Sequence, residues 1–389
     1  MTQNLPETSP KLFGQFLPKE KKPFMAMVEV TNRCNMACPI CYSDASPNIK
    51  DKPIAEVTRA LEQLLELTET PIPLQISGGE PTLRDDLPQI IAIAKQMGYR
   101  NIEVISNGIR IASEPGYLDT LKQEGLTAVY LQFDGLQPET TLAIRGQDMT
   151  AVRHKAVEVI GTSELCCTLA VVVTKGVNDH EIGDIINFAI KNITVVRAIN
   201  FQSATRLTGR FNIEEQYEGY NLNDLLALIE QQTSIGADTF ISEHLGHNSC
   251  NAMSPVFLVD NALEPLFKHV NKDGALHFLG KDSREKILST FGGKRHFFGR
   301  HLLSKEAWKL IAQAAPIFGN NPYNVLKSKH ILIFAKAFME KTALDPERIA
   351  NCCYAITSEK GIFSFCAYNN LYRFNDERDN ENIKKDDIS

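Results

Sequence analysis

Between residues 24 and 210 the chain alternates regularly between strand and helix patterns, and this regularity limits its fold more than any other feature. Short segments rich in apolar and β-branched residues are each followed by a segment with apolar residues at helical spacing. The pair recurs six times over about 180 residues with short connections, which is typical of a parallel sheet with helices on its outer faces. We therefore predict an α/β fold whose core, residues 24–210, is a partial, TIM-like (β/α)6 barrel.

The individual elements are predicted from the hydrophobic period of each segment. Strands are predicted over 24–31, 72–77, 101–106, 127–133, 166–174 and 195–202, and helices over 53–70, 86–98, 114–125, 151–160 and 179–191. The chemically unusual segments come directly after strands. In a β/α barrel that is the edge at which active sites are built.

The rest of the chain follows a different pattern. Beyond residue 211 the alternation stops, and we expect a smaller, mostly helical, cysteine-bearing domain over 211–374. Its predicted helices span 222–232, 303–315 and 322–341. Residues 1–23 are predicted to be an N-terminal extension. Residues 375–389 are charged and nearly free of apolar residues, so we predict a disordered tail.

Three cysteines follow the first predicted strand, at Cys34, Cys38 and Cys41. Their C-x3-C-x2-C spacing suits three thiolate ligands of one 4Fe–4S cluster, which leaves the fourth iron open to a substrate or cofactor. The alternatives are a zinc site completed by a distant Cys or His, or three unrelated buried thiols. Zinc sites more often use paired C-x2-C knuckles, and the sequence has no second knuckle, so we favour the cluster.

Polar residues also follow the later strands. Paired glycines at a strand end let a ligand approach the backbone closely, and a carboxylate beside them can pair with an ammonium group. Taken singly, each of these residues fits a turn, a cap or a surface charge equally well. The residues are Gly78-Gly79-Glu80-Pro81, Ser106-Asn107, Asp134 and Arg145.

Taken together, the cysteine loop and these strand ends resemble the radical S-adenosylmethionine (SAM) enzymes. In that family the open iron binds the amino and carboxylate groups of SAM, and reductive cleavage yields a 5′-deoxyadenosyl radical that abstracts hydrogen. The resemblance implies that Cys34, Cys38 and Cys41 hold the cluster. The cofactor-binding residues that it implies are Tyr42, Gly78, Gly79, Glu80, Pro81, Ser106, Asn107, Asp134 and Arg145.

Four further cysteines lie downstream, at Cys250, Cys352, Cys353 and Cys366. We expect them to be candidate ligands of a second 4Fe–4S cluster. Because the side chains of adjacent Cys352 and Cys353 diverge, His244, His247 or an open iron would complete it. The alternative is that these thiols are buried as small hydrophobes.

A narrower resemblance comes from residues 31–42, 202–210, 247–250, 352–353 and 365–369. These segments look like the branch that contains archaeal tetraether lipid synthase and the dihydropterin methyltransferases. That branch implies carbon–carbon bond formation, alkylation or methylation of a lipid or pterin-like substrate. Modification of a peptide or small metabolite is the second hypothesis. A non-catalytic zinc or iron–sulfur redox-sensing protein is the hypothesis from another class.

Composition limits the location and the partners. The net charge of -6 gives no reason to expect nucleic acid. No apolar run approaches the ~20 residues of a membrane span, so we expect at most peripheral membrane contact. Nine cysteines without a secretory signal indicate metal chemistry in a reducing compartment, and we predict a cytoplasmic protein. The expected partners are a small-molecule or lipid substrate and an electron donor such as flavodoxin or ferredoxin.

Overall fold

The computed structural model describes residues 12–17, 22–213, 217–242, 246–274, 309–310, 312–319, 328–358 and 360–373. The predicted tail 375–389, most of the predicted helix 303–315, His244 and much of the N-terminal extension lie outside these residues.

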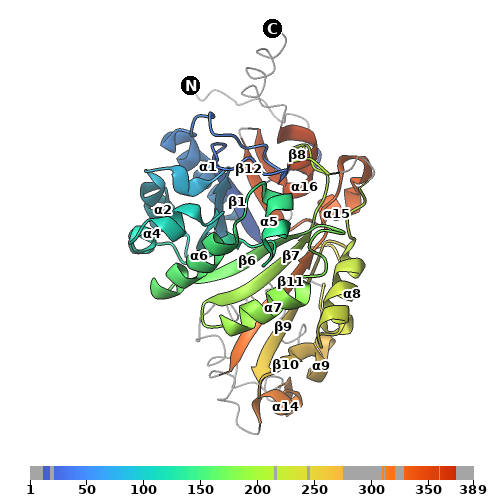
Figure 1. Ribbon diagram of the computed structural model, residues 1–389. Coiled ribbons are helices and arrows are strands. Elements are labelled where there is room, and N and C mark those ends of the chain that lie inside the picture. The colour runs from blue at the N-terminus through green and yellow to red at the C-terminus, as the bar shows by residue number, and fades with distance from the viewer. Residues whose placement is uncertain are drawn as a thin grey trace.

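Six strands form the centre of one curved, parallel-dominated sheet (Figure 1). They are β1 (Met25–Thr31), β3 (Leu74–Gly78), β4 (Ile102–Ser106), β5 (Ala128–Gln132), β6 (Cys166–Val173) and β7 (Val196–Ser203). Each is parallel to its neighbours in chain order. The six strands that the sequence predicts are therefore confirmed, as is the α/β class.

Amphipathic helices cover the outer face of this sheet (Figure 1). Helix α1 shows why, because Val57, Leu61 and Leu64 recur at helical spacing and are buried against the strands. The helices between the central strands are α1 (Ile54–Thr68), α2 (Leu87–Gln96), α3 (Ile109–Ser113), α4 (Tyr117–Glu124), α5 (Pro138–Arg145), α6 (Thr150–Thr162) and α7 (Ile182–Lys191). Of these, α3 and α5 are additions to the predicted set.

The C-terminal region extends the same sheet. Its strands are β9 (Asn251–Val259), β10 (Ala262–Pro265), β11 (Lys329–Lys336), β12 (Tyr354–Ser358) and β13 (Gly361–Ser364). The full order is β10-β9-β11-β7-β6-β5-β4-β3-β1-β12-β13. Strand β11 runs parallel to β7, and β12 runs parallel to β1. The barrel core thus gains a parallel strand at each end.

The prediction of a helix over 322–341 is wrong for its described residues. Residues 329–336, inside the predicted helix 322–341, form β11. A short apolar run fits a buried strand as well as a helix, and only its two strand neighbours decide the outcome. Helix α8 (Leu222–Gln232) is confirmed and begins at a capping box between Asn221 and Asp224. The other helices here are α9 (Leu266–His269), α14 (Ala315–Phe318), α15 (Pro346–Ala350) and α16 (Phe365–Ala367).

Within the described ranges, no helix combines the length and the apolar character that crossing a bilayer requires.

Candidate cluster and cofactor site

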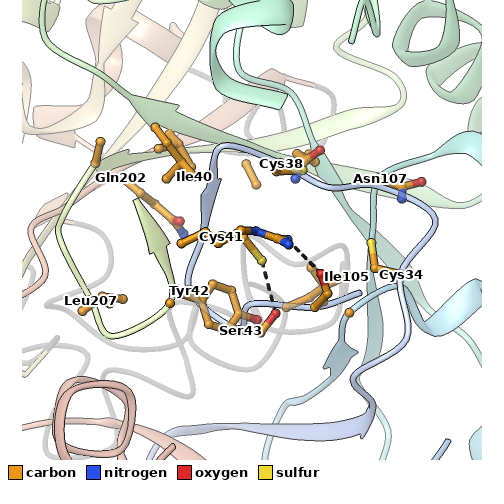
Figure 2. Close-up of a pocket in the computed structure, with 18 of the residues that line it drawn as sticks. Cys34, Cys38, Ile40, Cys41, Tyr42, Ser43, Ile105, Asn107, Gln202 and Leu207 are labelled. Carbon is orange, nitrogen blue, oxygen red and sulfur yellow. Dashed lines mark hydrogen bonds between the residues drawn. The ribbon is translucent and has the colours of Figure 1, made fainter. Parts of the chain in front are cut away.

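The three cysteines after β1 line one cavity at the carboxyl ends of the barrel strands. Cys34 and Cys38 are buried and Cys41 is partly buried, and all three pack in one small apolar cluster. Figure 2 shows them along a single loop, with Asn107 on one side of the cavity and Gln202 on the other. The cavity is open to solvent on one side.

A short antiparallel ladder fixes the cysteine loop. Strand β2 (Ile40–Cys41) pairs with β8 (Arg210–Phe211), which follows β7, and places Cys41 opposite Arg210. The Arg210 guanidinium donates to the Ala45 carbonyl at 2.8 Å. A Cβ atom on Gly209 would lie 2.1 Å from the Cys41 carbonyl oxygen, so only glycine fits there. The third cysteine therefore depends on a segment far along the chain.

This dependence can be tested by changing Gly209 to alanine. The added methyl must push β8 away from Cys41, and overpacking of this kind costs about 1–3 kcal/mol. We expect lower stability in urea and less iron bound after reconstitution. Gly274→Ala is the matched control, because its Cβ would meet its nearest atom at 3.4 Å, an ordinary contact. Equal iron loading of the two variants would contradict this role of β8.

The surroundings of the thiols differ. Burial alone would raise the pKa of Cys41, but hydrogen bonds from Ser43 and Ala45 and the charge of Arg210 outweigh it and lower that pKa. Burial raises the pKa of Cys34 to about 12. Burial also raises the pKa of Cys38, against the opposing charge of Arg145. Donors that stabilise a thiolate are what iron ligation needs, because thiolate is the ligating form.

The three thiols line one cavity, and the hydrogen-bond donors around them fit a cluster. Among the described residues, no three His, Cys, Asp or Glu side chains form a group that could hold a metal ion as they stand. The main-chain N–H of Met36 donates to Cys34 Sγ at 3.4 Å, and Cys41 Sγ lies 3.4 Å from Ser43 Oγ. Each of these two sulfurs thus has a protein hydrogen-bond partner.

Gly78 and Gly79 bring β3 against the cysteine loop. A Cβ atom would lie 2.0 Å from the Thr31 carbonyl oxygen at Gly78 and 2.3 Å from the Arg33 carbonyl oxygen at Gly79. The amides of Gly79 and Glu80 donate to these same two oxygens at 2.7 and 2.8 Å. The two glycines line the cavity, but in this structure the close approach that they permit is to the protein backbone.

Glu80 organises the next two strand ends. Its side chain is buried and lines the cavity, and burial raises its pKa. One carboxylate oxygen accepts from the Ser106 hydroxyl at 2.9 Å, and the other accepts from the Asn107 amide at 2.7 Å. The Asn107 side chain in turn donates to Asn35 Oδ1 in the cysteine loop at 2.8 Å. Ser106 and Asn107 both line the cavity.

Asp134 lies behind the cavity wall, buried in an ion-pair cluster. Arg145 binds both of its carboxylate oxygens at 2.7 Å, and Arg153 adds a third bond at 2.6 Å. Burial alone would raise the pKa of Asp134, but the two guanidinium groups hold it below its ordinary value. Arg145 reaches the cavity and donates to the Ile40 carbonyl of the cysteine loop at 3.3 Å. Asp134 therefore affects the cavity indirectly, by holding the Arg145 side chain in place.

Two other predicted residues take different places. Pro81 starts a short 3-10 turn (Pro81–Leu83) and does not line the cavity. Tyr42 lines it, and its hydroxyl lies 3.1 Å from Ser77 Oγ. The sequence does not predict roles for Ser43, Gly209 and Arg153. Each role depends on a contact that no sequence motif signals.

A second cavity, called the lower cavity below, lies toward the amino ends of the barrel strands. The cavity around the cysteine loop is called the upper cavity. All four downstream cysteines line the lower cavity, as does His247. Arg348 Nε donates to Cys250 Sγ at 3.1 Å. Burial raises the pKa of Cys250 and raises that of Cys366 to about 11. None of the nine cysteines, all within the described residues, forms a disulfide.

The barrel, the three-thiol loop and the Gly-Gly-Glu strand end define a radical SAM enzyme. The sequence profile of the radical SAM superfamily matches residues 28–189, and the chain belongs to that superfamily. Enzymes of this superfamily use a 4Fe–4S cluster and SAM.

Individual relatives extend the comparison. The chain is 31% identical over 400 residues to the 7,8-dihydro-6-hydroxymethylpterin dimethyltransferase of Methanocaldococcus jannaschii, which covers 90% of this chain and 77% of that protein. It is 28% identical over 181 residues to a probable GTP 3′,8-cyclase of Methanothermobacter thermautotrophicus, over 46% of this chain and 58% of the cyclase. The structure of Streptococcus suis SuiB bound to S-adenosylmethionine aligns with a TM-score of 0.45 and 20% identity, over 54% and 47% of the two chains.

Proposed function

We propose that this radical SAM enzyme alkylates or methylates an unactivated carbon of a pterin-like substrate. The observation that carries the proposal is the shared cavity, which joins the three thiols, the Gly-Gly-Glu strand end and Arg145 to the barrel interior. The similarity to a dihydropterin dimethyltransferase over 90% of the chain supports the substrate class.

In this proposal Cys34, Cys38 and Cys41 would hold the cluster, and the strand end that carries Gly78, Gly79 and Glu80 would help to bind SAM. When bound and reduced, the cluster would supply one electron for the cleavage of SAM to methionine and a 5′-deoxyadenosyl radical, which would abstract hydrogen from the substrate. Asn107 holds the cysteine loop against this strand end. Arg145 places a positive charge next to Cys38.

Polar side chains in the barrel interior offer hydrogen-bond partners to a polar substrate. Tyr130 accepts hydrogen bonds from the side chains of Asn200 and Gln202, both at 2.6 Å. Gln75 donates to Glu103 at 2.6 Å in the same interior.

The direct test is anaerobic turnover. Reconstituted protein is incubated with SAM, dithionite and 7,8-dihydro-6-hydroxymethylpterin, and the products are identified by mass spectrometry. We expect 5′-deoxyadenosine together with a pterin that carries a new carbon substituent. If 5′-deoxyadenosine forms while the pterin is unchanged and a lipid or peptide extract is modified, the substrate class is wrong.

We also propose a second 4Fe–4S cluster in the lower cavity, held by Cys250, Cys366 and one of Cys352 and Cys353. The wild-type chain should then bind about eight irons, and Cys366→Ala should bind about four. Cys167→Ala is the control, since Cys167 is a core thiol on β6. Iron content near four in the wild type, unchanged in Cys366→Ala, would make the downstream cysteines structural.

A further inference from the structure

Polar side chains from neighbouring strands meet inside the barrel, between the two cavities. Gln75 on β3 lies beside Glu103 on β4 in the ladder, and Tyr130 on β5 lies near Asn200 on β7. We call Gln75, Glu103, Tyr130 and Asn200 the lumen belt. All four line the lower cavity, and Tyr130 lines the upper cavity as well. A molecule bound near the cysteine loop would therefore have this belt beneath it.

Aromatic side chains bridge the space between β11 and β12, which are not neighbours in the sheet. The rings of Phe338 and Phe365 are 4.9 Å apart, and those of Tyr354 and Phe365 are 5.6 Å apart. These three residues line both cavities. They offer an apolar wall against which a flat ring can stack.

Glu103 gives the belt a defined chemical preference. Among the described residues that line the lower cavity, it is the single carboxylate. Gln75 and Thr168 hydrogen-bond to it in the free protein, and a carboxylate has about four acceptor positions. It can therefore accept two more N–H groups, which favours a ligand with adjacent N–H donors.

Among the described residues, other polar groups of the interior also lack hydrogen-bond partners in the free protein. Within the described residues, no donor reaches the buried acceptor atoms Asn200 Oδ1 and Gln132 Oε1. The lysine and arginine residues that line the lower cavity are Arg197, Lys336 and Arg348, and Arg348 already binds Cys250 and the Ala337 carbonyl. A heterocycle rich in N–H donors matches the acceptor atoms of Glu103 and Asn200.

We propose that Glu103 binds the 2-amino-4-oxopyrimidine edge of the substrate, while the aromatic residues Phe338, Tyr354 and Phe365 stack on its ring. That edge presents a ring N–H beside an exocyclic amine, and a carboxylate accepts the two in parallel, as in bidentate pairs. Pterins and guanine nucleotides share this edge. The choice of pterin rests on the proposed function.

The test compares ligands that differ at this edge. Anaerobically reconstituted full-length protein is titrated with 6-hydroxymethylpterin and with 6-hydroxymethyllumazine, in which an oxo group replaces the 2-amino group. Binding is followed by the fluorescence anisotropy of the pteridine, and GTP is added as a competitor. The variant is Glu103→Gln, and the matched control is the exposed Glu62→Gln on α1.

We expect the wild type and Glu62→Gln to bind the pterin at least about tenfold more tightly than the lumazine. Glu103→Gln should weaken pterin binding about 10- to 100-fold, as expected for loss of charged hydrogen bonds. It should also remove the preference, because a carboxamide can donate to the 2-oxo group. The ratio of the two affinities does not depend on the fraction of folded protein.

The outcomes separate this inference from the proposed function. An unchanged pterin-to-lumazine ratio in Glu103→Gln overturns the assignment of Glu103 and leaves pterin alkylation standing. Tighter binding of GTP than of the pterin, lost in Glu103→Gln, supports the edge contact but overturns the pterin substrate. If the wild type binds neither pteridine nor GTP, the inference fails, and the turnover experiment decides the proposed function independently.

Discussion

Changing Cys38 to alanine is expected to abolish formation of 5′-deoxyadenosine. Cys38 is buried in the wall of the upper cavity, next to Arg145. Without its thiolate the loop offers only two sulfur ligands, and about four irons should be lost per chain. The measurements are iron and sulfide content, the visible spectrum, and 5′-deoxyadenosine formed from SAM and dithionite.

The control for this experiment is again Cys167→Ala, which also removes a buried thiol but from the apolar core of β6. It should keep its cluster and its SAM cleavage. SAM cleavage at the wild-type rate by Cys38→Ala would show that the cluster is held elsewhere.

A large loss of stability is expected when Asp134 is changed to alanine. The change leaves Arg145 and Arg153 buried without their shared carboxylate. Breaking a buried ion pair by removing one partner typically costs about 3–5 kcal/mol. The free energy of unfolding in urea at neutral pH measures this cost. Because Arg145 also contacts the cysteine loop, iron loading should fall as well.

The pH dependence provides a second measurement of the same cluster. The pKa of Asp134 is lower in the folded protein than its ordinary value, so its stabilisation is present at neutral pH and is lost as the pH falls through the folded-state pKa. Asp134→Ala should remove this part of the acid dependence. The control Asp119→Ala changes an exposed residue of α4 and should cost less than about 1 kcal/mol. Similar losses in the two variants would argue against a structural role for the ion pairs.

The barrel core could be predicted because its elements are local. Each strand–helix unit carries its own hydrophobic period, so β3 and α1, for example, follow from neighbouring residues. The pairing of β11 with β7 could not be predicted in this way. Its apolar run has no amphipathic period, and its partner on the other side, β9, lies on a different part of the chain.

The site was predictable to the extent that it lies at strand ends. The cysteine spacing and the polar residues after β3 and β4 were sufficient to bring Cys34, Glu80 and Asn107 to one cavity. The position of Asp134 depends on Arg153, which has no motif signal on its helix. Tertiary ion pairing, rather than sequence spacing, decides that Asp134 lies behind the wall.

The parallel pairing of β12 with β1 has a consequence for the order of assembly. Met27, on the strand that leads to the cysteine loop, pairs with Ile356 near the other end of the chain. During synthesis, the strand that supports the cluster ligands therefore lacks one edge partner until residues 354–358 have emerged. Such long-range pairing forms late, because a long loop must close first. We expect iron to be incorporated after β12 has paired with β1.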